Sequence, residues 1–176
     1  MENLPRHFLR MAEALTLLTI YNLLFFWQAW TKPFSLATSE LLSTYFPSWI
    51  HQGRGEKYDS YYWLHYRAHP VLSFYYPPQR ALSKLVSSLS LDMQFRSFVF
   101  NLLIHYNLCM VGWFLLIHSF SSLEVAIFGA ITLTYSSYNI KQQPCLIYTI
   151  SWFPWLLLGI ATHSILLSSI SFGMIL

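Results

Sequence analysis

The fold is decided by FRSFVFNLLIHYNLCMVGWFLLI, residues 95–117, in which Arg96 is the one Lys, Arg, Asp or Glu side chain. A helix needs about 20 apolar residues to cross roughly 30 Å of bilayer hydrocarbon, so this stretch is long enough to span a membrane. A second apolar stretch, LRMAEALTLLTIYNLLFFWQAW, occupies residues 9–30. It ends with Trp27 and Trp30, and tryptophan gathers at membrane interfaces. Together the two stretches predict an integral membrane protein.

Two more apolar stretches follow, over about residues 123–138 and 147–170. The first is short for a span, and the second contains Pro154, which we expect to kink the helix or mark an unwound entry. Ser121 and Glu124 have the spacing of a capping box, which predicts a tight turn between the second and third spans. We therefore predict an all-α fold of about four transmembrane helices, forming a single membrane domain over residues 1–176.

Composition agrees with this class and excludes others. The chain is 55% hydrophobic, 19% aromatic and only 10% charged, which one soluble core of this size could not bury. The net charge of +3 comes from scattered basic residues, so no nucleic-acid partner is expected. Cys109 lies within a predicted span and Cys145 in a polar connection, so both are expected to be free thiols. The histidines lack the spacing of a zinc site.

Orientation follows from the basic residues beside the first span. Arg6 and Arg10 precede it, which predicts a cytoplasmic N-terminus and an extracytoplasmic loop over about residues 32–94. Lys141, on a connection that this topology places outside, speaks against it. A competing interpretation is a cleaved signal peptide, because Ser35-Leu36-Ala37 has a small-x-small pattern before Thr38.

The loop over residues 32–94 is long enough to carry structure of its own. A first short helix is predicted to start at Ser39 and to end by Gly53, bent at Pro47. A second is predicted to start at Pro78 and to lie along the membrane surface. Its apolar face would carry Ala81, Leu82, Leu85, Val86 and Leu89, and its polar face Arg80, Lys84 and Ser87. The simpler alternative is that this helix only covers the ends of the spans.

Several aromatic and proline motifs resemble the N-terminal part of the bacterial YfhO family. They are SELLSTYFP (39–47), the region of Trp63, His69-Pro70, FYYPP (74–78), YSSY (135–138) and SWFP (151–154). That family consists of multi-spanning proteins of the bacterial cytoplasmic membrane, similar to GT-C glycosyltransferases. The resemblance runs from the first to the fourth span. It implies membrane-surface helices in the outer loop, a functional carboxylate soon after the first span, and a polyprenyl-phosphate-linked sugar as donor.

Two departures from the family pattern matter. Glu40 stands where the family usually has Asp, which places the carboxylate one methylene further out. The family also has many more spans, so the chain would correspond to the N-terminal portion of a larger architecture. The remaining spans would belong to the rest of a longer protein or to another membrane chain.

The resemblance assigns roles to residues of the outer loop. Glu40 would be the catalytic base or a ligand of Mg²⁺ or Mn²⁺, with Glu56 and Asp59 as further metal ligands. The simpler alternatives are that Glu40 only starts a helix and that the other two carboxylates are solvated loop charges.

Basic and aromatic residues of the same loop would complete the site. Arg67, Arg80 and Lys84 would contact phosphate oxygens or lipid headgroups. Stacking on the sugar or prenyl group would fall to Tyr61, Tyr62 and Trp63, which could equally form an interfacial belt.

Three functions remain open from the sequence. The first is a module of an envelope glycosyltransferase, and the second is a non-catalytic remnant or a small membrane assembly subunit. The third is a small transport component, suggested by Asn101 and His105, which lie four residues apart on one face of the second span. An interhelical hydrogen bond is the simpler role for that pair.

Overall fold

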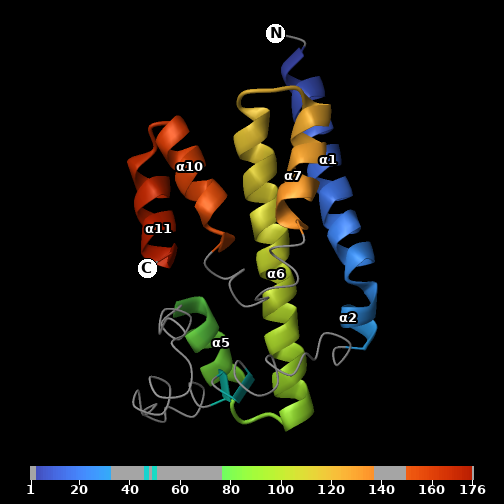
Figure 1. Cartoon of the computed structure of the whole chain (residues 1–176), viewed down its shortest axis with the longest axis vertical. Coiled ribbons are helices and arrows are strands. Elements are labelled where there is room, and N and C mark those ends of the chain that lie inside the picture. The colour runs from blue at the N-terminus through green and yellow to red at the C-terminus, as the bar shows by residue number, and fades with distance from the viewer. Residues whose placement is uncertain (1–2, 33–45, 48, 51–76, 137–149, 176) are drawn as a thin grey trace.

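A computed structural model describes residues 3–32, 46–47, 49–50, 77–136 and 150–175 (Figure 1). Every regular element within these ranges is a helix, which confirms the all-α prediction. The elements are α1 (Asn3–Phe25), α2 (Trp27–Thr31), α5 (Pro77–Val86), α6 (Leu91–His118), α7 (Leu123–Thr134), α10 (Phe153–Ala161) and α11 (Ile165–Ile175).

Two of these helices, α1 and α6, are long and apolar enough to cross a membrane. With 23 and 28 residues they measure about 35 Å and about 42 Å at 1.5 Å per residue. The other apolar helices are shorter, since α7 has 12 residues, α10 has 9 and α11 has 11. Within the described residues, two helices rather than four therefore reach membrane length.

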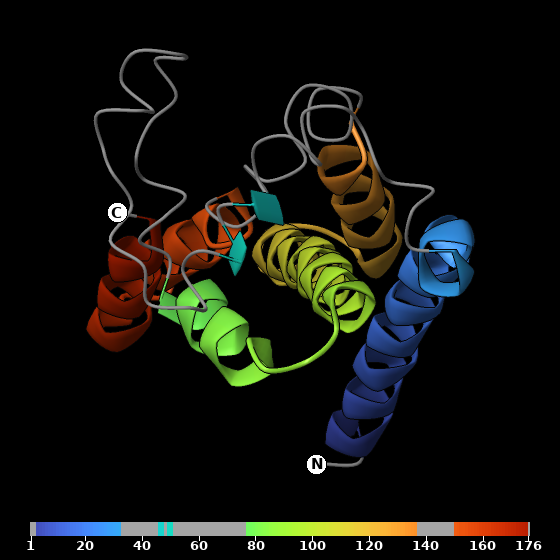
Figure 2. The same cartoon turned by 90° about the horizontal axis from the view of Figure 1, so that it is seen from below.

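Helix α6 is the axis of the molecule, because α1, α5, α7 and α10 all pack against it (Figures 1 and 2). Helix α11 packs mainly on α10. Helix α1 runs antiparallel to α6, so that Leu18 shares a buried cluster with Phe114 while Asn22 contacts the carbonyl of Leu103. A second cluster surrounds Phe95 and Phe98 in the N-terminal half of α6. The helices are thus arranged around the central helix α6 rather than stacked in layers.

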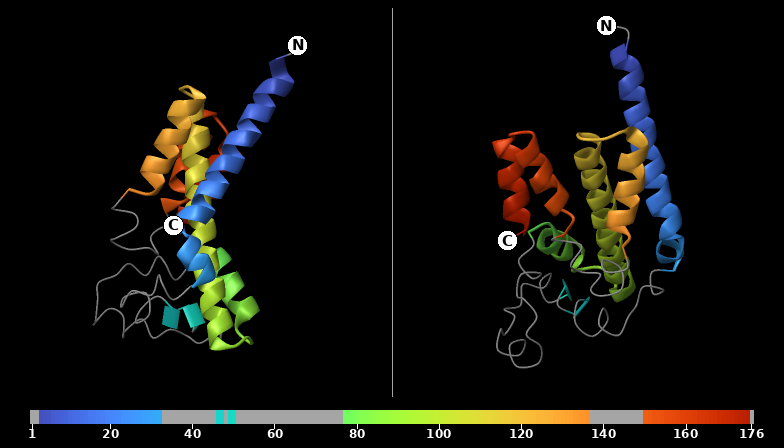
Figure 3. Two further views of the ribbon diagram at one scale, coloured as in Figure 1. Left: turned by 90° about the vertical axis from the view of Figure 1, so that its right-hand side faces the viewer. Right: turned by 45° about the horizontal axis from the view of Figure 1, so that its top comes forward.

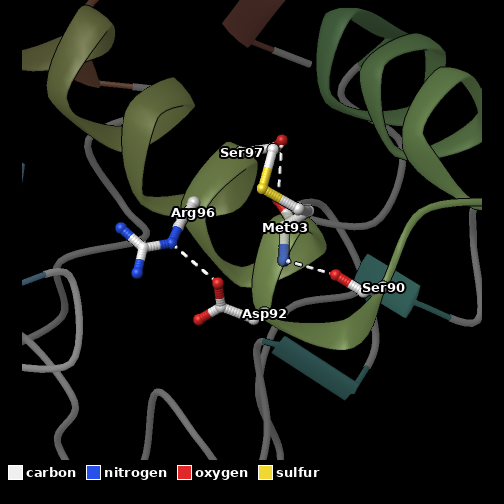
Figure 4. A network of polar contacts seen from close by, with 5 residues as sticks. All are labelled: Ser90, Asp92, Met93, Arg96 and Ser97. Carbon is white, nitrogen blue, oxygen red and sulfur yellow. Dashed lines mark hydrogen bonds and ion pairs between the residues drawn. The ribbon is translucent and has the colours of Figure 1, made fainter.

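The start of α6 lies at Leu91, four residues before the predicted start of the span (Figure 4). Ser90 is the N-cap, and its hydroxyl accepts a hydrogen bond from the backbone N–H of Met93 at 3.4 Å. Asp92 occupies the first turn, where a negative charge is favourable, and accepts from Arg96 Nε at 2.8 Å. These polar contacts extend the helix beyond its apolar stretch, into what was predicted to be loop.

The turn between α6 and α7 is tight, as predicted, but its N-cap was assigned one residue too early. Ser122 caps α7, with its hydroxyl accepting from Val125 N at 3.5 Å. Ser121 instead donates to the carbonyl of Ile117 at 2.8 Å and so closes the end of α6. Helix α7 then ends at Thr134 rather than near 138. Its small buried residues Ala126 and Ala130 let it lie close to α6.

The predicted single span over 147–170 is interrupted by a chain reversal (Figure 3). Helix α10 ends at Ala161, and His163 adopts a left-handed conformation with φ of 54°. Its N–H bonds the carbonyl of Ile160 at 3.1 Å, while Ser164 N–H bonds that of Gly159 at 2.8 Å, which is a Schellman motif. Ser164 also caps α11 by accepting from Leu167 N at 3.3 Å. Hydropathy cannot register such a break, so it was missed.

Helix α10 is held against α6 by a close approach at its first turn. Pro154 occupies the second position of α10 and therefore starts this helix instead of kinking a longer one. Trp155 Nε1 donates to the carbonyl of Leu108 at 3.0 Å. A Cβ at Gly112 would lie 2.7 Å from Trp155 Nε1, so only glycine leaves room for this contact. As Figures 1 and 3 show, the α10–α11 turn lies at the same end of the molecule as the α6–α7 turn.

Helix α5 packs on α6 through a face that differs from the predicted one. Val86 and Ser83 are buried and Leu82 is half-buried, whereas Leu85 is 77% exposed. Gln94, at the start of α6, donates to the carbonyls of Leu89 and Ser87 and so ties α6 to the turn that follows α5. Three of the five residues of the predicted apolar face, Ala81, Leu85 and Leu89, are therefore exposed.

Hydroxyl groups of several helices bond back to the carbonyl four residues earlier. The donors are Thr16 (2.8 Å), Thr19 (3.0 Å), Thr31 (3.0 Å), Ser97 (2.9 Å), Thr162 (2.8 Å) and Ser168 (3.0 Å). Each of these hydroxyl groups donates its hydrogen bond within its own helix or turn, so it needs no acceptor on another segment.

The α10–α11 hairpin offers a test of its packing. A Cβ on Gly159 would lie 2.7 Å from Ser168 N and 3.1 Å from its Cα, and backbone atoms cannot move aside. We predict that Gly159→Ala destabilises the protein by about 1–3 kcal/mol. Gly173→Ala is the control, because nothing lies within 4 Å of its Cβ position. Denaturant unfolding in detergent micelles would measure both, and equal stability of the two variants would contradict the hairpin.

Candidate functional site

Most of the residues assigned to the site from the sequence lie outside the described residues. These are Glu40, Glu56, Asp59, Arg67, Tyr61, Tyr62 and Trp63. Their arrangement therefore stays a prediction. In the part of the chain that the structure describes, no group of three or more His, Cys, Asp or Glu side chains could hold a metal ion.

Two assigned residues, Arg80 and Lys84, lie four positions apart on α5. Lys84 is exposed and occupies the last turn of the helix, where a positive charge is favourable. The side chain of Arg80 is outside the described part. Helix α5 packs near the N-terminal end of α6, so Lys84 can reach an anionic group at that end.

Two aromatic residues of the segment between α2 and α5 pack against this same end of α6. Phe46 and Trp49 are buried, and their rings pack against Phe98 at centroid distances of 5.8 Å each. Phe46 also meets Phe95 edge-on at 4.9 Å. Phe46 follows Glu40 by six residues. The aromatic motif of residues 39–47 therefore contributes to the core through Phe46.

A buried polar network joins α1, α6 and the end of α7. Asn22 Nδ2 donates to the carbonyl of Leu103 at 3.3 Å, and the hydroxyl of Tyr135 donates to Asn22 Oδ1. Asn22 is 3% exposed, so these bonds replace the water that its amide would otherwise bind. The network fixes how far α1 can slide along α6.

The ring of Tyr135 lies at the centre of an aromatic cluster. It stacks nearly parallel on Tyr106, with ring centroids 6.2 Å apart, and contacts Phe25 at 4.4 Å and Phe26 at 5.8 Å. Tyr21 meets it edge-on at 5.5 Å. The residue that ends α7 thus contacts α1 through both its hydroxyl and its ring, and α6 through its ring.

The pair Asn101 and His105 is buried on α6, as the sequence suggested. His105 Nδ1 lies 2.7 Å from the carbonyl of Asn101, a contact within one helix rather than between helices. The amide nitrogen Nδ2 of Asn101 has no hydrogen-bond partner in the described part of the chain, although the residue is only 6% exposed. Asn101 is therefore a buried donor that no described group satisfies.

The start of α10 has no side-chain cap. Its N-cap is Trp152, which has no side chain suited to capping, and no side-chain cap bond is formed. The N–H groups of the first turn of a helix have no intrahelical acceptor, and Pro154 lacks an N–H altogether. The N–H groups of Phe153 and Trp155 lie at the positive end of the helix dipole, directly after the turn at Ser151 and Trp152.

Sequence reasoning identified Asn101 and His105 but missed the Asn22–Tyr135 contact. A signal was available, since Ala14, Leu18 and Asn22 recur every four residues and form the buried stripe of α1. An asparagine on such a stripe must find a partner. Its partner could not be located from the sequence, because Tyr135 lies 113 residues further along the chain.

Comparisons with known proteins found no matching family model, no matching curated protein and no matching solved structure.

The Asn22–Tyr135 contact yields a direct test. We predict that Tyr135→Phe lowers the free energy of unfolding by about 0.6–2 kcal/mol, because the ring packing remains while Asn22 Oδ1 loses its donor. Tyr21→Phe is the matched control, since it preserves a neighbouring ring of the same cluster. Thermal unfolding in micelles would compare the two. An equal loss in both variants would mean that the hydroxyl of Tyr135 contributes nothing specific.

Proposed function

We propose that the chain is a multi-pass integral protein of the bacterial cytoplasmic membrane. The apolar exposure of α1 carries this proposal. Ala14, Leu18 and Asn22 form its narrow packed stripe, whereas Phe8 is 72% exposed and Leu24 is 66% exposed. In water such a helix would present a large apolar surface, and in a bilayer the same surface meets lipid.

The proposal includes an orientation with the N-terminus in the cytoplasm. It rests on Arg6 and Arg10 before the first span. Because the α6–α7 and α10–α11 turns lie at the end of α6 that faces the start of α1, both turns would also be cytoplasmic (Figure 3). Helix α5 and the anchored residues Phe46 and Trp49 would lie on the outer side.

This topology can be tested with single cysteines in a background that lacks Cys109 and Cys145. We predict that Ser119→Cys and His163→Cys are both labelled by an impermeant maleimide in inside-out vesicles and protected in intact cells. Ser88→Cys, in the turn after α5, should show the reverse pattern. Labelling of His163→Cys from the outside would contradict the parallel arrangement of α6 and α10.

For the activity, we propose a glycosyltransferase-like module that uses a polyprenyl-phosphate sugar at the outer membrane face. Its support is the resemblance of SELLSTYFP (39–47) and the later motifs to the YfhO family. Two observations are consistent with a site at the N-terminal end of α6. Phe46 and Trp49 hold the segment after Glu40 on α6, and Lys84 presents a positive charge at the same end. In the proposed chemistry Glu40 accepts the proton of the acceptor hydroxyl, and cations stabilise the departing phosphate.

A second candidate is a non-catalytic membrane assembly subunit. One observation favours it, namely the apolar surface of the α10–α11 hairpin, where Ile165 is 83% exposed and Leu166 is 73% exposed. That surface would be covered by lipid or by another membrane chain. Such a subunit would depend on its partner for stability and would not need Glu40.

The two candidates separate on the Glu40 side chain. We predict that Glu40→Gln abolishes sugar transfer to below about one hundredth of the wild-type rate, because the base is lost, while membrane insertion is unchanged. Glu40→Asp should retain transfer, since it restores the carboxylate that the family usually has. Glu13→Gln, in α1, is the control for loss of a carboxylate.

The assay would follow radiolabelled sugar from membrane lipid in cells that lack the native chain. Full activity of Glu40→Gln would remove the transferase assignment and favour the assembly subunit.

A further inference from the structure

One face of α6 is turned away from the helices that pack on it. Ile104, Asn107 and Val111 follow one another at intervals of three and four residues, so they share this face. Ile104 is 44% exposed, and Asn107 and Val111 are half-buried. We refer to these three residues as the open face of α6.

The open face lies between the contacts of α6 with α1 and with α10. On one flank, the carbonyl of Leu103 and the side chain of Met110 contact α1. On the other flank, Leu108 and Gly112 contact the first turn of α10. Figure 2 shows α1 and α7 to one side of α6, and α5 and α10 to the other. The exposure of Ile104 means that no described helix covers the face between them.

Asn107 lies near the middle of the proposed membrane span. It precedes the end of α6 at His118 by eleven residues. At 1.5 Å per residue this is about 16 Å, or half of the hydrocarbon thickness of roughly 30 Å. Water and lipid headgroups are absent at this depth, so a polar side chain there depends on another protein group.

The side chain of Asn107 has no such group within the described part of the chain. Its Oδ1 is without a hydrogen-bond partner there. An amide left unpaired in hydrocarbon costs free energy. The terminal torsion of asparagine is soft, so either the oxygen or the nitrogen can turn toward the open face. Asn107 is thus a polar group at a surface that lipid alone cannot satisfy.

A second copy of the chain supplies a matching partner. Copies that enter the membrane in the same orientation place equivalent residues at equal depth. A two-fold axis along the membrane normal would then bring Asn107 against its own counterpart. The amide is self-complementary, because each Nδ2 can donate to the other Oδ1. Ile104 and Val111 would pack on either side, and their branched side chains have little rotamer freedom to lose.

We propose that the chain forms a parallel dimer in the membrane through the open face of α6, with the two Asn107 side chains hydrogen-bonded at its centre. Asparagine side chains form such bonds across membrane helices. The dimer rests on the membrane location proposed above but not on the transferase activity.

Sedimentation equilibrium of the full chain in a density-matched neutral detergent tests the dimer. We expect a reversible equilibrium between monomer and dimer for the wild type. Asn107→Leu removes the amide at similar volume and should weaken dimerisation about three- to thirtyfold. Asn107→Gln keeps an amide and should retain most of the dimerisation. Ile104→Ala, which removes packing on the same face, should also weaken it.

Thr132→Leu is the matched control. Thr132 is an exposed residue of α7, outside the open face, and this change also replaces a polar side chain by leucine. Dimerisation of this variant should equal that of the wild type.

Three results would overturn the proposal. They are a wild type that stays monomeric at all concentrations, an effect of Asn107→Leu no greater than that of Thr132→Leu, or a loss with Asn107→Gln as large as that with Asn107→Leu. Failure of the membrane proposal is recognised separately, because the protein would then remain in solution without detergent.

Discussion

The whole arrangement depends on the burial of α6 by helices that do not otherwise meet one another extensively. Helices α1, α5, α7 and α10 each pack on a different part of its surface. At about 42 Å, α6 is longer than the hydrocarbon core of a bilayer, so in the proposed membrane location one end would extend beyond it. Its N-terminal end is suited to water, because Ser90 caps it and Asp92 pairs with Arg96 there. One helix thus provides both the central axis of the described fold and the surface on which Phe46 and Trp49 pack.

In the proposed membrane location, apolar packing alone would leave these helices free to slide or rotate, because lipid would solvate their side chains as well as protein does. Specific contacts remove that freedom. Asn22 and Tyr135 tie α1 to α6 and to the end of α7, while Trp155 ties α10 to Leu108. Small residues complement these bonds where backbones approach, as at Gly112 and Gly159. The polar contacts set the register, and the glycines set the distance.

The sequence was informative where length and hydropathy determine structure. Residues 95–117 predicted the central helix, and the Ser-Ser pair before Glu124 predicted a tight turn, although the cap is Ser122 rather than Ser121. It was uninformative where a single backbone conformation decides the outcome. The reversal at His163 needs a left-handed residue, and nothing about Thr162-His163-Ser164 distinguishes it from a polar patch inside a span.

The site was predicted less completely than the fold. The roles of Glu40 and of the loop aromatics came from a resemblance, and those residues lie outside the described part. Asn101 was recognised because an amide within a span is costly, yet its unpaired donor depends on what surrounds it in three dimensions. The face of α5 was mispredicted for a similar reason, since Leu85 is apolar but 77% exposed.

The hydroxyl groups that bond back to their own helices bear on how such a chain enters a bilayer. Residue scales assign each serine or threonine the cost of dehydrating a free hydroxyl. In Thr16, Thr19 and Ser168 the proton already binds a carbonyl one turn away. The effective partition free energy of these segments is therefore more favourable than their summed residue values. The membrane-insertion machinery of a cell would accordingly insert these segments more readily than their amino-acid composition predicts.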